Sequence, residues 1–179
     1  MLKIAYDDYT KRISTSDAAI SLETAFYLWD LCEKKNPNVV VDTGSGFSSF
    51  VLRLWAKQSK KEVIVYSFDD NEYWIEKSIS FSKQHELDIR NFVIWNDHNI
   101  SIKNADIVLH DLGDMSTRSR TLKIVSSMLN QHGTLILDDL HKTAYNTDAQ
   151  TFFKSQRRTI TKLAETIDAF GRFAGSVEF

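Results

Sequence analysis

Short apolar runs alternate with longer amphipathic segments along most of this chain. The apolar runs are typical of buried strands, and we expect strands at residues 39–42, 62–68, 91–95, 105–110 and 134–137. The segments between them place apolar side chains three and four positions apart, as on a helix with one buried face. Helices are therefore expected at residues 18–35, 47–57, 72–85, 117–129 and 147–158.

The order of these elements predicts the fold. Strands that alternate with helices form a mostly parallel sheet with helices on both faces. Residues 159–167 alternate in part, Gly171 marks a turn, and residues 172–179 have the pattern of a last strand. We therefore expect a C-terminal antiparallel hairpin that brings the sheet to seven strands. The prediction is one doubly wound α/β domain, with a helical N-terminal lid at residues 1–36 and a core at residues 37–179.

Composition and charge narrow the classes of function. Apolar residues are 42% and charged residues 26% of the 179 residues, which fits one globular domain. The net charge of −2, without a strongly basic block, argues against nucleic acid as the main partner. The single cysteine, Cys32, excludes an internal disulfide and suits a reducing cytoplasm. No apolar run reaches the roughly 18 residues of a membrane span, and the N-terminus lacks a signal-peptide core, so a cytoplasmic location is expected.

A glycine-rich turn follows the first strand. The pattern is Asp42-x-Gly44-x-Gly46-x-Ser48, and a helix is expected from Phe47. Glycines have no Cβ and let a ligand approach the backbone, while a helix N-terminus offers free N–H groups and the positive end of its dipole. The turn therefore predicts a nucleotide-type binding corner. The alternative is a plain tight turn between a strand and a helix.

Polar side chains also end the second and third strands. Asp69 stands about 20 positions beyond the glycine-rich turn, where an acidic residue typically holds ribose hydroxyls. The alternative role is a helix cap, and we assign the ribose to Asp69 and the cap to Asn71. The polar loop 96–99 follows the third strand and contains Asp97. Asp97 can accept a hydrogen bond from an adenine amino group, or it can belong to an ordinary solvated loop.

Two neighbouring strands end in pairs of carboxylates. The fourth strand leads into Asp111 and Asp114, and the fifth into Asp138 and Asp139. Like charges gathered at one sheet edge repel one another unless a cation joins them, and oxygen ligands suit Mg²⁺, Ca²⁺ or Mn²⁺. One alternative is that these acids cap helices or bind backbone groups. Another is that Lys142 or Arg118 folds over the acids, so that no cation is needed. His141 follows the second pair, as a metal ligand, a general base or an ordinary loop histidine.

Several stretches together resemble the class I S-adenosylmethionine-dependent methyltransferases over nearly the whole chain. They are residues 41–49, 65–69, 106–111, 132–139 and the terminal hairpin, which is similar to the reversed last strand of that family. Within the class, the set of Asp111, Asp138 and Asp139 is similar to small-molecule O-methyltransferases of the macrocin and catechol types. In those groups, acids at these strand ends bind a divalent metal that orients a substrate hydroxyl.

The resemblance implies roles for these residues. S-adenosylmethionine would contact a set that comprises Asp42, Thr43, Gly44, Ser45, Gly46, Ser48, Asp69, Asp70, Asp97 and Asp111. Within that set, Gly44 and Gly46 would lie near the methionine part, Asp69 at the ribose and Asp97 near adenine. Mg²⁺ or another divalent cation would be held by Asp111, Asp138 and Asp139, with His141 and Asp111 as the catalytic residues. The catechol type has a lysine base where this chain has Asp114, which argues against a catechol-like acceptor.

The expected function is methyl transfer from S-adenosylmethionine to a hydroxyl of a small molecule, with a divalent metal as a candidate helper. Three alternatives stay open. A methyltransferase acting on a macromolecule would fit the absence of an evident substrate domain, although the net acidity speaks against RNA or DNA. A non-catalytic cofactor-binding protein would bind the same cofactor without turnover. A nicotinamide-dependent dehydrogenase fits less well, because the third glycine of its fingerprint is missing. The oligomeric state stays open, a homodimer included.

Overall fold

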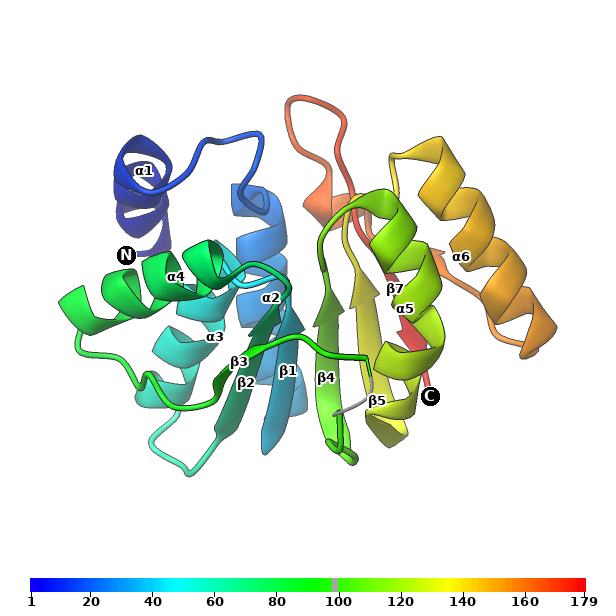
Figure 1. Ribbon diagram of the computed structural model, residues 1–179, viewed down its shortest axis with the longest axis horizontal. Helices are drawn as coiled ribbons and strands as arrows, with labels where there is room; N and C mark the ends of the chain where they lie inside the picture. The colour runs from blue at the N-terminus through cyan, green and yellow to red at the C-terminus, as the bar shows by residue number, and fades with distance from the viewer. Residues whose placement is uncertain (98–99) are drawn as a thin grey trace.

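A single mixed sheet forms the centre of the molecule. The computed structural model describes residues 1–97 and 100–179, so His98 and Asn99 of the predicted polar loop lie outside the described residues. Within them, seven strands are ordered β3-β2-β1-β4-β5-β7-β6 (Figure 1). The strands are β1 (Val39–Thr43), β2 (Ile64–Asp69), β3 (Phe92–Ile94), β4 (Ala105–His110), β5 (Leu129–Leu137), β6 (Thr161–Lys162) and β7 (Gly175–Glu178). The first five are parallel, and β7 runs antiparallel between β5 and β6. The predicted doubly wound sheet with a C-terminal antiparallel hairpin is confirmed.

Helices cover both faces of the sheet. They are α1 (Leu2–Arg12), α2 (Leu22–Lys35), α3 (Phe47–Gln58), α4 (Glu72–Gln84), α5 (Met115–Ser127) and α6 (Thr143–Ser155), with a short 3₁₀ turn, η1 (Ala164–Thr166). Successive strand residues point to opposite faces, so each face has its own core. Ile107 and Ile136 pack with helices α1–α4 on one face. Val41, Val108 and Leu135, which are partners across three strands, pack with α5 and α6 on the other (Figure 1).

Capping residues explain where several helices begin. Asn71 accepts a hydrogen bond from the Tyr73 N–H at 3.0 Å, as predicted for the cap of α4. Asp114 accepts from the Thr117 N–H at 2.7 Å, so α5 begins two residues earlier than expected. Ser21 caps α2, which therefore begins later than the predicted residue 18. None of the described helices is long and apolar enough to cross a membrane.

Other boundaries differ because tertiary packing overrides the local pattern. No separate helix was predicted before residue 18 of the N-terminal segment, although Leu2, Ala5 and Tyr9 of α1 have the helical spacing and are buried. Strand β5 is longer than the predicted strand at residues 134–137, and Gly133 lies inside it. A side chain at Gly133 would collide with Leu129 and the Ala105 carbonyl. This glycine therefore permits close strand packing.

The strand order determines where a ligand can bind. Strand β1 lies between β2 and β4, so the chain leaves it toward β2 on one side and returns to β4 on the other. In open α/β sheets, ligands bind at the carboxyl ends of the strands where the order reverses in this way. The glycine-rich turn, Asp69 and Asp111 all follow these strand ends.

Candidate functional site

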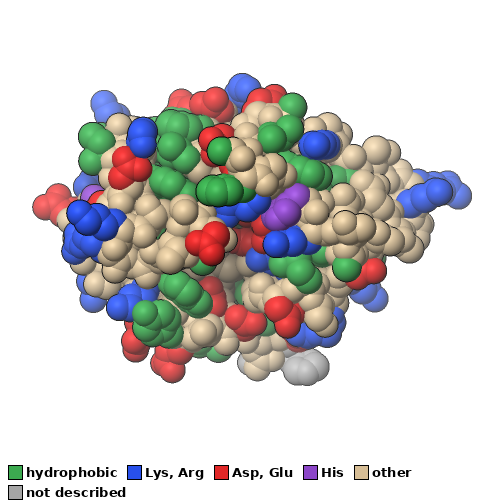
Figure 2. Space-filling view, turned by 90° about the horizontal axis from the view of Figure 1, so that it is seen from above, with side chains coloured by type: hydrophobic (Ala, Val, Ile, Leu, Met, Phe, Trp, Pro, Cys, Tyr) green, Lys and Arg blue, Asp and Glu red, His purple; other side chains and the backbone are tan. Residues whose placement is uncertain are grey.

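A cavity of about 470 Å³ lies over the carboxyl ends of β1, β2 and β4. Figure 2 looks onto this face of the molecule and shows acidic, basic and histidine side chains gathered around its middle. The floor and walls come from the turn at residues 44–48, from residues 69–71 with Trp74, and from the segment after β4. Tyr9, Ser14 and residues 18–20 of the N-terminal segment line it as well. The segment predicted as a lid thus contributes to the cavity wall.

The two glycines of the turn have different roles. Gly44 has φ +99°, and a Cβ there would lie 2.3 Å from the Asp111 carbonyl oxygen. The close packing of the β1 and β4 ends therefore requires glycine at position 44. The predicted role of Gly44 considered only the space that the ligand needs. A Cβ on Gly46 would meet only the Tyr9 hydroxyl, at 3.5 Å. Gly46 is the position where the backbone is open to the cavity.

Asp42 and Thr43 are not among the residues that line the cavity, and their contact with the cofactor stays a prediction. Both are completely buried. The Asp42 carboxylate accepts hydrogen bonds from the hydroxyls of Ser49 and Ser67, and burial raises its pKa to about 6. The Thr43 hydroxyl is shared between the Leu109 carbonyl and His110 Nδ1. These two residues hold the turn in place from beneath.

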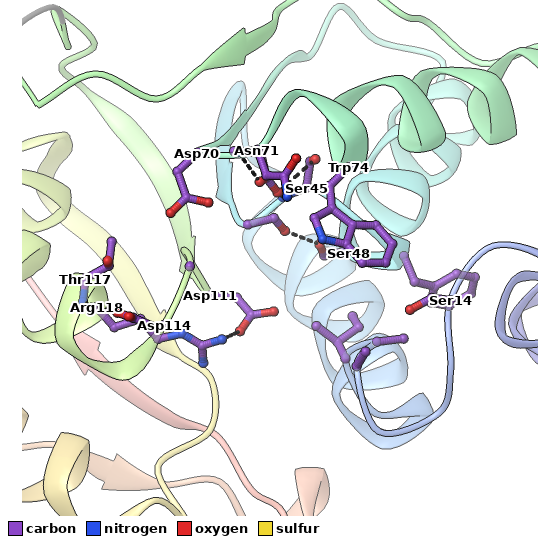
Figure 3. Close-up of a pocket in the computed structure, with 18 of the residues that line it drawn as sticks. Ser14, Ser45, Ser48, Asp70, Asn71, Trp74, Asp111, Asp114, Thr117 and Arg118 are labelled. Carbon is purple, nitrogen blue, oxygen red and sulfur yellow. Dashed lines mark hydrogen bonds and ion pairs between the residues drawn. The ribbon is translucent and has the colours of Figure 1, made fainter.

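Asp69 lines the cavity and is fixed by the turn. One of its carboxylate oxygens accepts from the Ser45 N–H at 2.7 Å and from the Ser45 hydroxyl at 3.1 Å. The other accepts from the Asn71 N–H at 2.9 Å. Burial raises the pKa of the Asp69 carboxyl. Its neighbour Asp70 points across the cavity toward the segment after β4 (Figure 3), where a Cβ on Gly113 would lie 2.5 Å from its carboxylate.

Asp97 is not among the residues that line the cavity. The Trp95 indole N–H donates to its carboxylate, and the Arg120 guanidinium pairs with it. Asp97 thus lies just after β3 and is paired with a side chain of α5. Its contact with adenine stays a prediction.

The Arg118 guanidinium lies between the predicted metal ligands. Its Nη2 is 2.5 Å from Asp111 Oδ1, and its Nη1 is 2.9 Å from Asp139 Oδ2. Figure 3 shows Arg118 extending from α5 to Asp111 along the cavity wall. Among the described residues, no three His, Cys, Asp or Glu side chains are placed to hold a metal ion. The arrangement therefore does not fit the predicted metal site, because a guanidinium already joins the acids.

Burial affects the ionisation of these acids. It raises the pKa of Asp111 well above its usual range, while Arg118 opposes that shift. Burial together with Asp139 raises the pKa of Asp138 to about 6. Asp138 is 8% exposed and does not line the cavity. Asp139 adopts a left-handed backbone, with φ +56°, at the turn that follows β5.

His141, the predicted base, lines a separate groove with Phe173 and the polar face of α6. Its Nδ1 lies 3.5 Å from Asp139 Oδ1 and makes no hydrogen bond. Burial lowers the pKa of His141, which favours the neutral ring that can accept a proton. The structure therefore separates His141 from the cavity that Asp111 lines.

Three further buried side chains lie near the site, and of these only Arg118 was considered from the sequence, as a side chain that could fold over the acids. Arg118 stands four positions after the Asp114 cap, a spacing that places it on the first turn of α5. His110 ends β4 and is completely buried. Arg53 interrupts the apolar face of α3, where its guanidinium donates to the Ser67 hydroxyl at 2.6 Å and burial lowers its pKa to about 10. A charged residue within an apolar helix face is the signal that could have identified Arg53.

The chain is similar over nearly its whole length to solved methyltransferase structures. The SAH-bound methyltransferase of Podospora anserina is 12% identical, with a TM-score of 0.78 over 99% of this chain and 87% of that one. The O-methyltransferase of Bacillus cereus in complex with SAH is 13% identical, with a TM-score of 0.78 over 99% and 90%. The O-methyltransferase from Streptomyces achromogenes involved in tomaymycin synthesis, in complex with SAM, is 11% identical, with a TM-score of 0.71 over 99% and 88%.

These likenesses define the class of fold. No family model and no curated protein matches the sequence, and identities of 11–13% establish the fold alone. The protein has the Rossmann-like fold of the S-adenosylmethionine-dependent methyltransferases, as its sequence motifs predicted. Fold by itself does not determine function, so the function is argued below from the cavity.

Proposed function

We propose that this protein binds S-adenosylmethionine in the cavity over β1, β2 and β4 and transfers its methyl group to a hydroxyl of a small molecule. One observation carries the proposal: Gly46, Asp69 and Asp111 line a single cavity at the point where the strand order reverses. The solved structures of similar fold that hold SAM or SAH support the choice of ligand.

The charges around the cavity favour this cofactor over a nicotinamide dinucleotide. Four lining side chains are carboxylates, those of Asp69, Asp70, Asp111 and Asp114, and Arg118 is the cation among the lining residues. S-adenosylmethionine carries a sulfonium and an ammonium group, which such a cavity attracts. A dinucleotide carries an anionic pyrophosphate, which the carboxylates would repel. The cavity therefore selects a positively charged nucleoside.

Methyl transfer from this cofactor requires mainly that the protein align the acceptor with the methyl group. The positive sulfur of the cofactor activates the methyl group, and the protein has to place the acceptor oxygen in line and exclude water. Tyr9 and Trp74 line the cavity and would exclude water once the ligands are bound, while Asp111 marks the end nearest β4. His141 remains a predicted base. It can act as one only if the groove that it lines joins the cavity when the acceptor binds.

Calorimetric titration with S-adenosylhomocysteine and with NAD⁺ tests the proposal. The wild type should bind S-adenosylhomocysteine and not NAD⁺. Asp69→Ala should weaken that binding by roughly 1.5–3 kcal/mol, which is typical of lost hydrogen bonds to a charged group. Because Asp69 also holds Ser45, the melting temperature of the variant must be measured beside its affinity.

Asp30→Ala on α2 is the matched control, since it removes an exposed carboxylate that is not among the residues lining the cavity. It should leave the affinity unchanged. Tighter binding of NAD⁺ than of S-adenosylhomocysteine would refute the methyltransferase proposal. Unchanged affinity in a folded Asp69→Ala variant would remove Asp69 from the ribose role.

A further inference from the structure

Arg118 occupies the place in which the sequence predicts a divalent cation. Its residue exposure is only 6%, and its two terminal nitrogens pair with carboxylates that come from the ends of two neighbouring strands. Asp111 follows β4 and Asp139 follows β5, so a single side chain joins the two strand ends. A planar guanidinium is suited to this task because it presents several donors in a fixed fork.

The arginine is held in this position by its own backbone and its helix. The Arg118 carbonyl accepts from the buried His110 Nε2 at 3.0 Å, and the Arg118 N–H donates to the Asp114 carbonyl at 2.9 Å. Because a carbonyl oxygen can only accept, His110 Nε2 carries a proton. The first turn of α5 is therefore attached to the end of β4, which makes Arg118 a fixed component of the cavity wall (Figure 3).

We propose that the Arg118 guanidinium takes the place of a divalent metal between Asp111 and Asp139, so that this site operates without one. The replacement of a metal by Arg118 does not depend on the proposed function. Only the reaction that we assign to this site, methyl transfer, rests on it. A guanidinium neutralises the acids but offers no open coordination position. The methyl acceptor would then be held by hydrogen bonds alone. An acceptor with two adjacent hydroxyls would not bind more tightly through chelation of a metal.

Removal of the arginine should expose a latent metal site. Arg118→Met keeps an unbranched apolar stem while it deletes the charge, and it leaves Asp111 and Asp139 without their shared counter-ion. We expect MnCl₂ to raise the melting temperature of this variant saturably, by about 5–10 °C at 100 times the dissociation constant. EDTA should reverse the shift, and the double variant Arg118→Met with Asp139→Asn should lose most of it. The wild type should show no saturable shift.

Arg120→Met is the matched control, because it deletes an arginine from the same helix that pairs with Asp97 instead of the strand-end acids. It should respond to MnCl₂ as the wild type does. If Arg118→Met is unfolded without metal, refolding on addition of MnCl₂ is the equivalent expected result. Arg118→Lys, which retains one charge, then serves as the second variant and should show a weaker shift.

Two results would overturn the proposal. A saturable shift in the wild type would mean that a metal displaces the arginine. The absence of any shift in both Arg118 variants would mean that the acids are not positioned to gather a cation. Neither result bears on the cofactor cavity, because the titration of the wild type with S-adenosylhomocysteine is independent of the metal measurement.

Discussion

At the scale of single residues, the glycine-rich turn combines two different requirements within three positions. Gly44 is left-handed and touches the end of β4, whereas Gly46 is extended and open to the cavity. The motif therefore contains one glycine required by folding and one that leaves space for a ligand. Substitutions at the two positions should separate stability from binding.

We predict that Gly44→Ala loses more than about 1 kcal/mol of unfolding free energy, because alanine is strained at positive φ and its Cβ would collide with the Asp111 backbone. Gly46→Ala should keep the stability of the wild type and bind S-adenosylhomocysteine less tightly, since its methyl group enters the cavity. Urea unfolding and calorimetry measure the two effects. Wild-type stability in Gly44→Ala would contradict this division, as would wild-type affinity in Gly46→Ala.

At the scale of elements, the C-terminal hairpin is tied to the N-terminal segment that lines the cavity. The Arg172 guanidinium donates to the carbonyls of Ser16, Asp17 and Ala19 at 2.8–3.2 Å. Asp168 holds the same guanidinium at 2.6 Å. Segments about 155 residues apart in the sequence are thereby joined above the carboxyl ends of the strands (Figure 1). We infer that this contact keeps residues 13–21 of the N-terminal segment in place over the cavity.

Arg172→Ala should therefore loosen residues 13–21 without unfolding the sheet. Hydrogen exchange followed by mass spectrometry should show faster exchange in that segment, and the affinity for S-adenosylhomocysteine should fall by about tenfold, or about 1.4 kcal/mol. Lys162→Ala is the control, because it deletes a cation from the same hairpin that lies over the Phe173 ring instead of pairing with the N-terminal segment. Unchanged exchange in residues 13–21 would show that Arg172 does not hold the segment.

At the scale of the whole molecule, a buried histidine connects the two central strands and α5. His110 contacts the Thr43 hydroxyl on β1 and the Arg118 carbonyl on α5. Burial lowers its pKa from 6.5 to about 4. The unfolded chain therefore binds a proton between about pH 4 and pH 6.5 that the folded protein does not bind. Across that range, the contribution of His110 to stability rises with pH, and above it the contribution is constant.

The stability advantage of the wild type over His110→Gln should accordingly shrink by about 3 kcal/mol as the pH falls from 6.5 to 4, at about 1.4 kcal/mol for each pH unit. Urea unfolding at several pH values measures this difference. His132→Gln, which changes an exposed histidine, is the matched control. A His110→Gln difference that is constant with pH would mean that folding does not shift the pKa of His110.

Local patterns were sufficient for most elements of the fold. Runs such as the valines of β1 and the helical spacing of α3 depend on neighbours in sequence, and each appeared where it was predicted. The hairpin partners were predicted as well, although β6 is only two residues long. Helix α1 was missed because its polar composition hides a narrow buried face, which only contact with α2 and α3 reveals.

The sequence by itself determined the class of fold, the turn with Gly44 and Gly46, and the arrival of Asp69 and Asp111 at one end of the sheet, because the alternation of strands with helices and the spacing of the motifs are properties of the sequence. The tertiary structure alone decided which of these side chains face the cavity. It placed Asp42 beneath the turn, paired Asp97 with Arg120, and brought Arg118 from α5 between Asp111 and Asp139. The physical reason is that a charge partner supplied by another element cannot be read from the residues beside the acid.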